Sequence, residues 1–220
     1  MSTNVSPRRP LRGSQARAER TRAMVIDETV RCVLEEGAAA ASAKHITERA
    51  GVTWGVVQYH FGDRDGLLMA VVDQGFSQLL DTLRGVDPNV VETTGRRRTA
   101  MLLDAVWAAF SSSTSVAALE ILVATRSGRS LLEQKHLTEL LSELTHLGRY
   151  IGDSLDRRRA DAIGELIWTA LLGSILAQMV VGRTVDTSRQ RRALLDTITA
   201  YIAQHESSPG PRRRRRRPVS

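Results

Sequence analysis

SAKHITERAGVTWGVVQYHFGDR, residues 42–64, carries the strongest local pattern in this chain and predicts two short helices joined by a tight turn. Ser42 is a suitable N-cap, and Ile46 and Ala50 lie four residues apart on one face of the first helix. Gly51 stands where a helix ends and the chain must turn through positive φ. We expect a second helix to start at once, capped by Thr53, and to end near residue 60.

The second helix is too short to bury much surface, yet one side of it is rich in polar and aromatic side chains. These are Thr53, Trp54, Gln58, Tyr59 and His60. In a helix-turn-helix, the second helix enters the major groove and its flanks hold phosphates. Gly55 would let the backbone approach closely, Gln58 can pair bidentately with adenine, and Tyr59 and His60 can reach phosphate oxygens. The pattern therefore predicts double-stranded DNA as the partner.

These residues resemble the TetR-type (TetR/AcrR) family of one-component transcriptional regulators. The matching positions are Ile46, Ala50, Gly51, Val52, Thr53, Gly55, Val57, Tyr59, His60, Phe61, Arg64 and Leu67. The match covers about the first 80 residues. Ala43 replaces a Thr that often holds a phosphate, which leaves Lys44 for that role. Gln58 and Trp54 also depart from the family pattern, so the operator sequence does not carry over.

The resemblance implies an all-α fold with about nine helices. It implies a three-helix N-terminal helix-turn-helix domain and a C-terminal helical domain for ligand binding and dimerisation. It further implies a homodimeric regulator, most simply a repressor, that binds a palindromic operator and is released by a small ligand. Arg64 is expected to touch phosphate. A shift of its helix on ligand binding is expected to change the separation of the two recognition helices.

The positive charge of the chain is concentrated at its two ends. The whole chain carries +7, residues 1–22 carry +5 and residues 207–220 carry +6, so the remainder carries −4. We expect a disordered basic arm over residues 1–14, with Arg8, Arg9 and Arg12 in the minor groove or on phosphates, unless it is only a solvated tail. Residues 206–220, with Arg212–Arg217, are expected to be a disordered tail whose role stays open.

Helical periodicity continues beyond the first motif. Expected helices span residues 15–36, 64–83, 97–112, 115–126, 130–155, 159–181 and 188–204. The turn-forming residues from Gly85 to Gly95 mark a boundary between a DNA-binding domain with its connecting helix, residues 15–84, and a ligand-binding and dimerisation domain, residues 96–205.

The helix predicted over residues 159–181 is the most hydrophobic segment. Its run from Leu166 to Val181 is short for crossing a membrane and is closed by Glu165 and Arg183. Small residues at four-residue spacing favour helix packing instead, together with apolar positions of the last helix. The expected dimer interface is Thr169, Gly173, Ala177, Leu194, Ile198 and Tyr201. The alternative is the buried centre of a monomeric domain.

A ligand pocket would be walled by large side chains of the middle helices and would suit a largely apolar small molecule. The candidates are Met101, Trp107, Phe110, Leu122, His146, Tyr150, Trp168 and Leu172. Plain core packing is the alternative for the apolar members, and a solvated face is the alternative for His146 and Tyr150.

The sequence contains no glycine loop for phosphates, no nucleophile elbow and no zinc-spaced set of Cys and His. We therefore expect neither an enzyme nor a metal or other cofactor.

Cys32 is expected to be a small core residue, with redox sensing as the alternative. The lack of a signal segment predicts a cytoplasmic protein. The rival functions are a helical metal-binding or enzymatic protein with a vestigial motif, and a nucleoid-type binder held by its Arg-rich ends.

Overall fold

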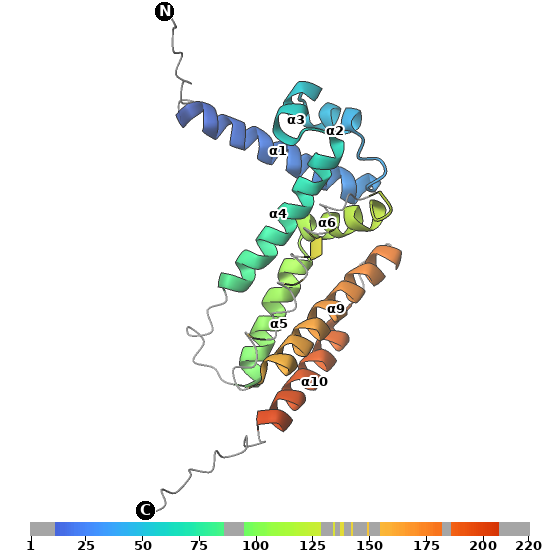
Figure 1. Ribbon diagram of the computed structural model, residues 1–220. Coiled ribbons are helices and arrows are strands. Elements are labelled where there is room, and N and C mark those ends of the chain that lie inside the picture. The colour runs from blue at the N-terminus through green and yellow to red at the C-terminus, as the bar shows by residue number, and fades with distance from the viewer. Residues whose placement is uncertain are drawn as a thin grey trace, which may run out of the picture. The chain divides into compact units, whose positions relative to one another are not determined.

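The computed structural model describes residues 12–85, 95–128, 155–181 and 186–206, together with residues 134, 137, 138, 142 and 149. All the regular elements in these ranges are α-helices, as the sequence predicts (Figure 1). They are α1 (Arg12–Glu36), α2 (Ala43–Ala50), α3 (Trp54–Phe61), α4 (Arg64–Gly85), α5 (Arg96–Phe110), α6 (Ser113–Ala124), α9 (Arg157–Val181) and α10 (Ser188–Glu206). The helix expected over residues 130–155 lies almost wholly outside the described residues, and so do Arg8, Arg9, His146, Tyr150 and the tail beyond residue 206.

The chain forms two compact units that interleave along the sequence. One unit contains residues up to Ser77 together with Ser112–Arg129, and the other contains Gln78–Ser111 together with residues from Ser130 onward. Helix α6, which the sequence assigns to the second domain, therefore belongs to the same unit as α1, α2 and α3. The domain limits 15–84 and 96–205 remain a prediction.

The N-terminal unit is built around α1, which packs against both α2 and α6. Its core consists of apolar side chains that are wholly removed from solvent, among them Ile26, Val33, Ile46, Val57 and Ile121. Leu34, which directly follows Val33 on α1, is 41% exposed. The buried face of α1 runs through Val30 and Cys32 on either side, because two partner helices cover a wider arc than a single stripe.

A close crossing of α4 and α6 within this unit depends on a glycine. A Cβ built at Gly75 would stand 3.1 Å from the Ala118 Cβ and 3.4 Å from the Thr114 carbonyl oxygen. Small residues on both helices therefore let the backbones approach closely.

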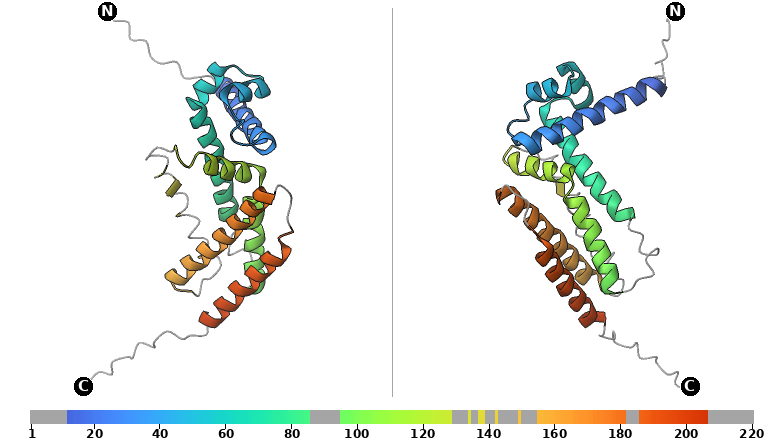
Figure 2. Two further views of the ribbon diagram at one scale, coloured as in Figure 1. Left: turned by 90° about the vertical axis from the view of Figure 1, so that its right-hand side faces the viewer. Right: turned by 180° about the vertical axis from the view of Figure 1, so that it is seen from behind.

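In the second unit, α5 packs against α9 and α10. Figure 2 shows α9 and α10 running side by side in opposite directions. Ile167, Leu171 and Ile198 are buried there, and two ion pairs join α5 to α10: Arg96 with Asp196 at 2.5 Å and Arg191 with Asp104 at 3.3 Å. The guanidinium of Arg191 also lies 5.3 Å from the centre of the Trp107 ring.

Candidate nucleic-acid interface

The turn between α2 and α3 is formed as the sequence predicts. The Ser42 side chain accepts a hydrogen bond from the His45 backbone N–H at 3.2 Å, which satisfies one donor at the start of α2. Gly51 has φ 63°, and the backbone N–H of Val52 reaches back to the Thr47 carbonyl at 3.1 Å. This left-handed cap stops α2 and lets α3 start three residues later.

Helix α3 is anchored by one apolar side chain and presents most of the others to solvent. Val57 is fully buried, whereas Tyr59 is 82% exposed and Trp54 is 40% exposed. Gln58 is exposed as well. A buried anchor on one side and a row of hydrogen-bonding and aromatic groups on the other is the arrangement of a helix that reads a groove.

Thr53 occupies the N-cap position of α3 in an extended conformation, but its side chain makes no capping hydrogen bond. The predicted cap is wrong in this respect. Because the Thr53 hydroxyl is exposed and not used by the helix, it is available to a phosphate or a base edge.

Gly55 has no structural requirement of its own. A Cβ at this position would meet only the Thr53 hydroxyl, at 3.8 Å, which is an ordinary contact. The folded chain would therefore accept a side chain here. The fold itself thus gives no steric reason for glycine at this position.

Three consecutive rings close α3. Tyr59 and His60 stand edge to face with centroids 5.0 Å apart, and the Phe61 ring follows at 5.9 Å from His60. The guanidinium of Arg22 on α1 lies 5.3 Å from the centre of the Phe61 ring. Tyr59 is 82% exposed in spite of this ring contact, so its phenol is accessible to a partner.

The loop between α1 and α2 is held from two directions. The Glu120 carboxylate on α6 accepts a hydrogen bond from the Ala38 backbone N–H at 2.7 Å. The Arg64 guanidinium donates to the Ala41 carbonyl at 2.8 Å and to the Ala38 carbonyl at 3.2 Å. Arg64, predicted as a phosphate ligand, thus has a structural task in fixing the entry to α2, and phosphate contact remains a prediction for it.

Lys44 at the start of α2 is free to move, because its side chain is 86% exposed and its pairing with Glu48 is long at 3.8 Å. Arg12, which the sequence assigns to the arm, begins α1 instead.

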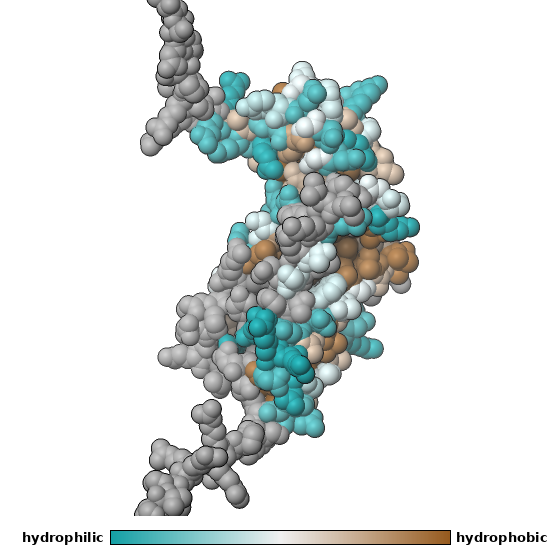
Figure 3. Space-filling view, in the orientation of Figure 1, coloured by the Kyte–Doolittle hydropathy of each residue, from teal (hydrophilic) through white to brown (hydrophobic). Residues whose placement is uncertain are grey.

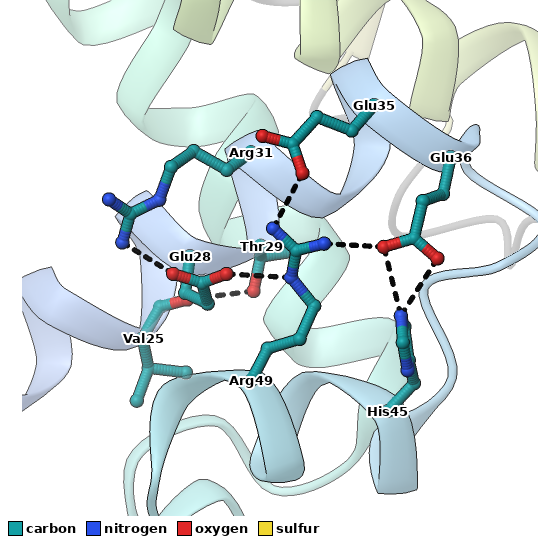
Figure 4. A network of polar contacts seen from close by, with 8 residues as sticks. All are labelled: Val25, Glu28, Thr29, Arg31, Glu35, Glu36, His45 and Arg49. Carbon is teal, nitrogen blue, oxygen red and sulfur yellow. Dashed lines mark hydrogen bonds and ion pairs between the residues drawn. The ribbon is translucent and has the colours of Figure 1, made fainter.

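A network of ion pairs joins α1 to α2 on the side that Figure 4 shows. Arg49 donates to Glu28 at 2.7 Å, to Glu35 at 2.7 Å and to Glu36. Glu28 is nearly buried, with a side chain 11% exposed, and the hydrogen bond from Arg49 holds its pKa below the usual range. These contacts fix α2 on α1 before any DNA is bound. They join residues up to 21 positions apart, which no local sequence pattern announces.

The predicted pocket residues are only partly brought together. Trp107 and Phe110 lie on α5, and Trp168 and Leu172 lie on α9, in one compact unit, with Phe110 buried. Met101 is 46% exposed, and Leu122 belongs to the other unit. An open pocket of about 180 Å³ lies instead between α9 and α10, lined by Ala162, Ile163, Leu166, Thr197, Ile198 and Tyr201.

The predicted dimer residues fall into two groups. Thr169, Gly173 and Ala177 are exposed along one side of α9, and a Cβ at Gly173 would meet nothing within 4 Å. On α10, Leu194 and Tyr201 are half-buried and Ile198 is wholly buried within the chain. Ile198 is therefore packed inside the chain and is not an exposed contact residue, and the interface itself remains a prediction.

Helix α9 leaves apolar surface uncovered. Leu166, Val180 and Val181 are 44%, 86% and 51% exposed, and Figure 3 shows hydrophobic side chains gathered over the C-terminal end of this helix. By length and composition α9 could cross a membrane, with only 28% of its most apolar window buried. Since small residues continue the exposed side, close contact with another helix accounts for the same pattern.

The described residues thus define a class: an all-helical protein whose N-terminal unit presents a helix-turn-helix. Comparison with known proteins supports this. Residues 25–71 match the family described as bacterial regulatory proteins, tetR family. Over 83 residues the chain is 35% identical to the HTH-type transcriptional regulator BetI of Paraburkholderia phytofirmans, which is 38% of this chain and 37% of that protein. The chain therefore spans little more than a third of that relative.

Solved structures extend the likeness in fold over most of the chain. A putative TetR-family regulator from Mesorhizobium loti matches with a TM-score of 0.67 at 16% identity, over 86% of this chain and 98% of the other. FadR from Bacillus subtilis, solved with stearoyl-CoA, matches with a TM-score of 0.58 at 15% identity, over 81% and 97%. Residues 25–71 thus carry the DNA-binding helix-turn-helix of the tetR family, and the fold over most of the chain is similar to that of TetR-type regulators.

Proposed function

We propose that the protein is a transcriptional repressor that binds a palindromic operator as a homodimer and is released by a small, largely apolar ligand. The observation that carries the proposal is α3, which is anchored by Val57 and exposes Trp54, Gln58 and Tyr59 beside a glycine that the fold does not need. In this arrangement Gln58 reads a base, and Lys44, Tyr59 and His60 hold phosphates.

The uncovered side of α9 supports the proposed dimer. One recognition helix of eight residues reads few base pairs, so specificity requires two copies about one helical turn apart on the duplex. The exposed Thr169, Gly173 and Ala177 allow a second copy of α9 to approach closely. Gly173→Asp would place a charge at the centre of that contact. It should convert the dimer into a monomer by light scattering, while a dimer that persists would place the interface elsewhere.

The proposed ligand is a small, largely apolar molecule. The interior of the unit that contains α5, α9 and α10 consists of buried apolar side chains. FadR, which has a similar fold, was solved with stearoyl-CoA. An apolar molecule suits this interior better than a highly charged one.

Selection in vitro finds the operator whichever genes the protein controls. Purified full-length protein is used to select duplexes from a random-sequence library at moderate salt. The proposal predicts enrichment of an inverted repeat, whose half-site changes at one or two positions when Gln58→Ala replaces the wild type. Selection without enrichment would instead favour a non-specific binder held by its basic ends.

A further inference from the structure

Cys32, Glu36 and His45 bring three kinds of metal-binding atom together in the N-terminal unit. Cys32 and Glu36 lie one turn apart on α1, and His45 lies on α2. The Cys32 sulfur, a Glu36 carboxylate oxygen and a His45 ring nitrogen all lie within 4.8 Å of one another. We propose that these three side chains bind a tetrahedral divalent metal ion, Zn²⁺ by their chemistry, with water in the fourth position.

The ligand set suits zinc. A thiolate, an imidazole and a carboxylate are the three donors that Zn²⁺ takes in proteins, and sites with three protein ligands keep a fourth position for water. Around a tetrahedral ion the ligand atoms stand roughly 3.5 Å apart, so distances of up to 4.8 Å must shorten by up to about 1.3 Å. The contraction falls on the side chains of His45 and Glu36, which are 37% and 36% exposed and free to adjust, whereas the cysteine is fully buried and fixed.

Two of the three proposed ligands, His45 and Glu36, are already in contact with each other. The Nε2 atom of His45 lies 2.9 and 3.0 Å from the two carboxylate oxygens of Glu36. An ion entering here replaces a hydrogen bond between two of its own ligands and does not break an unrelated contact.

The charge of the surrounding network also favours a cation. Three carboxylates, Glu28, Glu35 and Glu36, stand against two guanidinium groups, Arg31 and Arg49, which leaves one excess negative charge. Cys32 is buried, and a metal ion binds its sulfur as the thiolate. Binding then releases its proton to solvent and forms the sulfur–metal bond, and the ion with the new thiolate brings the network to neutrality.

Arg49 can lose its hydrogen bond to Glu36 and still be held between α1 and α2. It keeps hydrogen bonds of 2.7 Å to both Glu28 and Glu35 when Glu36 turns to the metal. The ion would therefore add a second tie between α1 and α2 beside the ion pairs. This proposal stands apart from DNA binding, because all three ligands lie within one protomer and none is a predicted DNA contact.

The test uses the full-length, reduced, metal-free protein and Co²⁺ as a spectroscopic substitute for Zn²⁺. The chain contains one cysteine, so any thiolate-to-cobalt charge-transfer band in the near ultraviolet must come from Cys32. We expect one equivalent of Co²⁺ to produce this band and Zn²⁺ to remove it. His45→Ala should weaken Co²⁺ binding by tenfold or more, and Cys32→Ser should abolish the band.

Glu35→Gln is the matched control, because it changes a carboxylate of the same network that is not a proposed ligand. It should keep the band and the affinity. Zn²⁺ should also raise the melting temperature of the wild type and of Glu35→Gln but not that of His45→Ala, a variant that retains the His45 backbone contact to Ser42. Absence of the band in folded wild type, or a band that His45→Ala leaves unchanged, would overturn the proposal.

Discussion

Replacing Gly55 by alanine should stabilise the protein and weaken its binding to DNA at the same time. Gly55 is the second residue of α3, and a methyl group there meets only the Thr53 hydroxyl at 3.8 Å. The fold therefore gives no steric reason for glycine. If the backbone of α3 approaches DNA at this point, the methyl group would occupy space that the partner needs.

The two effects have opposite signs and can be estimated separately. Exchanging glycine for alanine in a helix gains up to about 1 kcal/mol, and near a helix start about half of that, which raises the melting temperature by roughly 1 to 2 °C. An added methyl group in a close-packed contact costs about 1 to 3 kcal/mol. That cost weakens DNA binding roughly 5- to 150-fold.

Thermal unfolding followed by circular dichroism measures the first effect, and fluorescence anisotropy with a selected operator measures the second. Gly13→Ala is the matched control, since Gly13 is also the second residue of its helix and has open space around it. It should share the small gain in stability and leave the preference for operator over unrelated DNA unchanged, since the arm beside it makes contacts that do not depend on sequence. Unchanged operator affinity in Gly55→Ala would refute the close approach of α3 to DNA.

Three further outcomes are expected. In competition assays Tyr59→Ala should weaken binding to all DNA sequences, whereas Gln58→Ala should relax the preference at one or two base pairs, each effect being about 1 to 3 kcal/mol. If both variants lose the same affinity on every sequence, Gln58 does not read a base. Glu120→Ala leaves the backbone N–H of Ala38 without its acceptor and should lower the free energy of unfolding in urea by about 1 to 2 kcal/mol. Glu120→Gln keeps an acceptor oxygen and should retain most of that free energy. Equal stability of the two variants would mean that this hydrogen bond contributes nothing. Glu28→Gln should lower the melting temperature at pH 7 by roughly 3 to 6 °C. Because the folded-state pKa of Glu28 lies below its ordinary 4.5, the difference in melting temperature between wild type and variant should be complete above pH 4.5 and should narrow as the pH falls below it. A difference in melting temperature that does not depend on pH would exclude the ion pairs as its cause.

The local pattern predicts the helix-turn-helix well because its signals are themselves local. The Ser42 cap, the positive φ of Gly51 and the Asp63 carboxylate that accepts from the Gly66 N–H at 2.7 Å all depend on neighbours in sequence. Helix limits likewise agree within about three residues, because periodicity and capping residues set them.

Contacts between distant segments escaped prediction. Nothing around Glu120 indicates that it accepts from Ala38, 82 residues away, nor that α6 belongs to the N-terminal unit. For the same reason the Cys32 and His45 pair does not resemble a zinc motif: its spacing is set by the packing of α2 on α1 and not by a short loop.

The most direct test of the central claim is fluorescence anisotropy of the full-length protein with the selected inverted repeat and with a scrambled duplex of equal composition, across a salt series. A sequence-reading dimer predicts a preference of about a thousandfold or more that survives moderate salt, and that persists when the basic residues 1–11 and 207–220 are removed. Equal, steeply salt-dependent binding to both duplexes, lost on that truncation, would contradict the account and leave a binder that works through its arginine-rich ends.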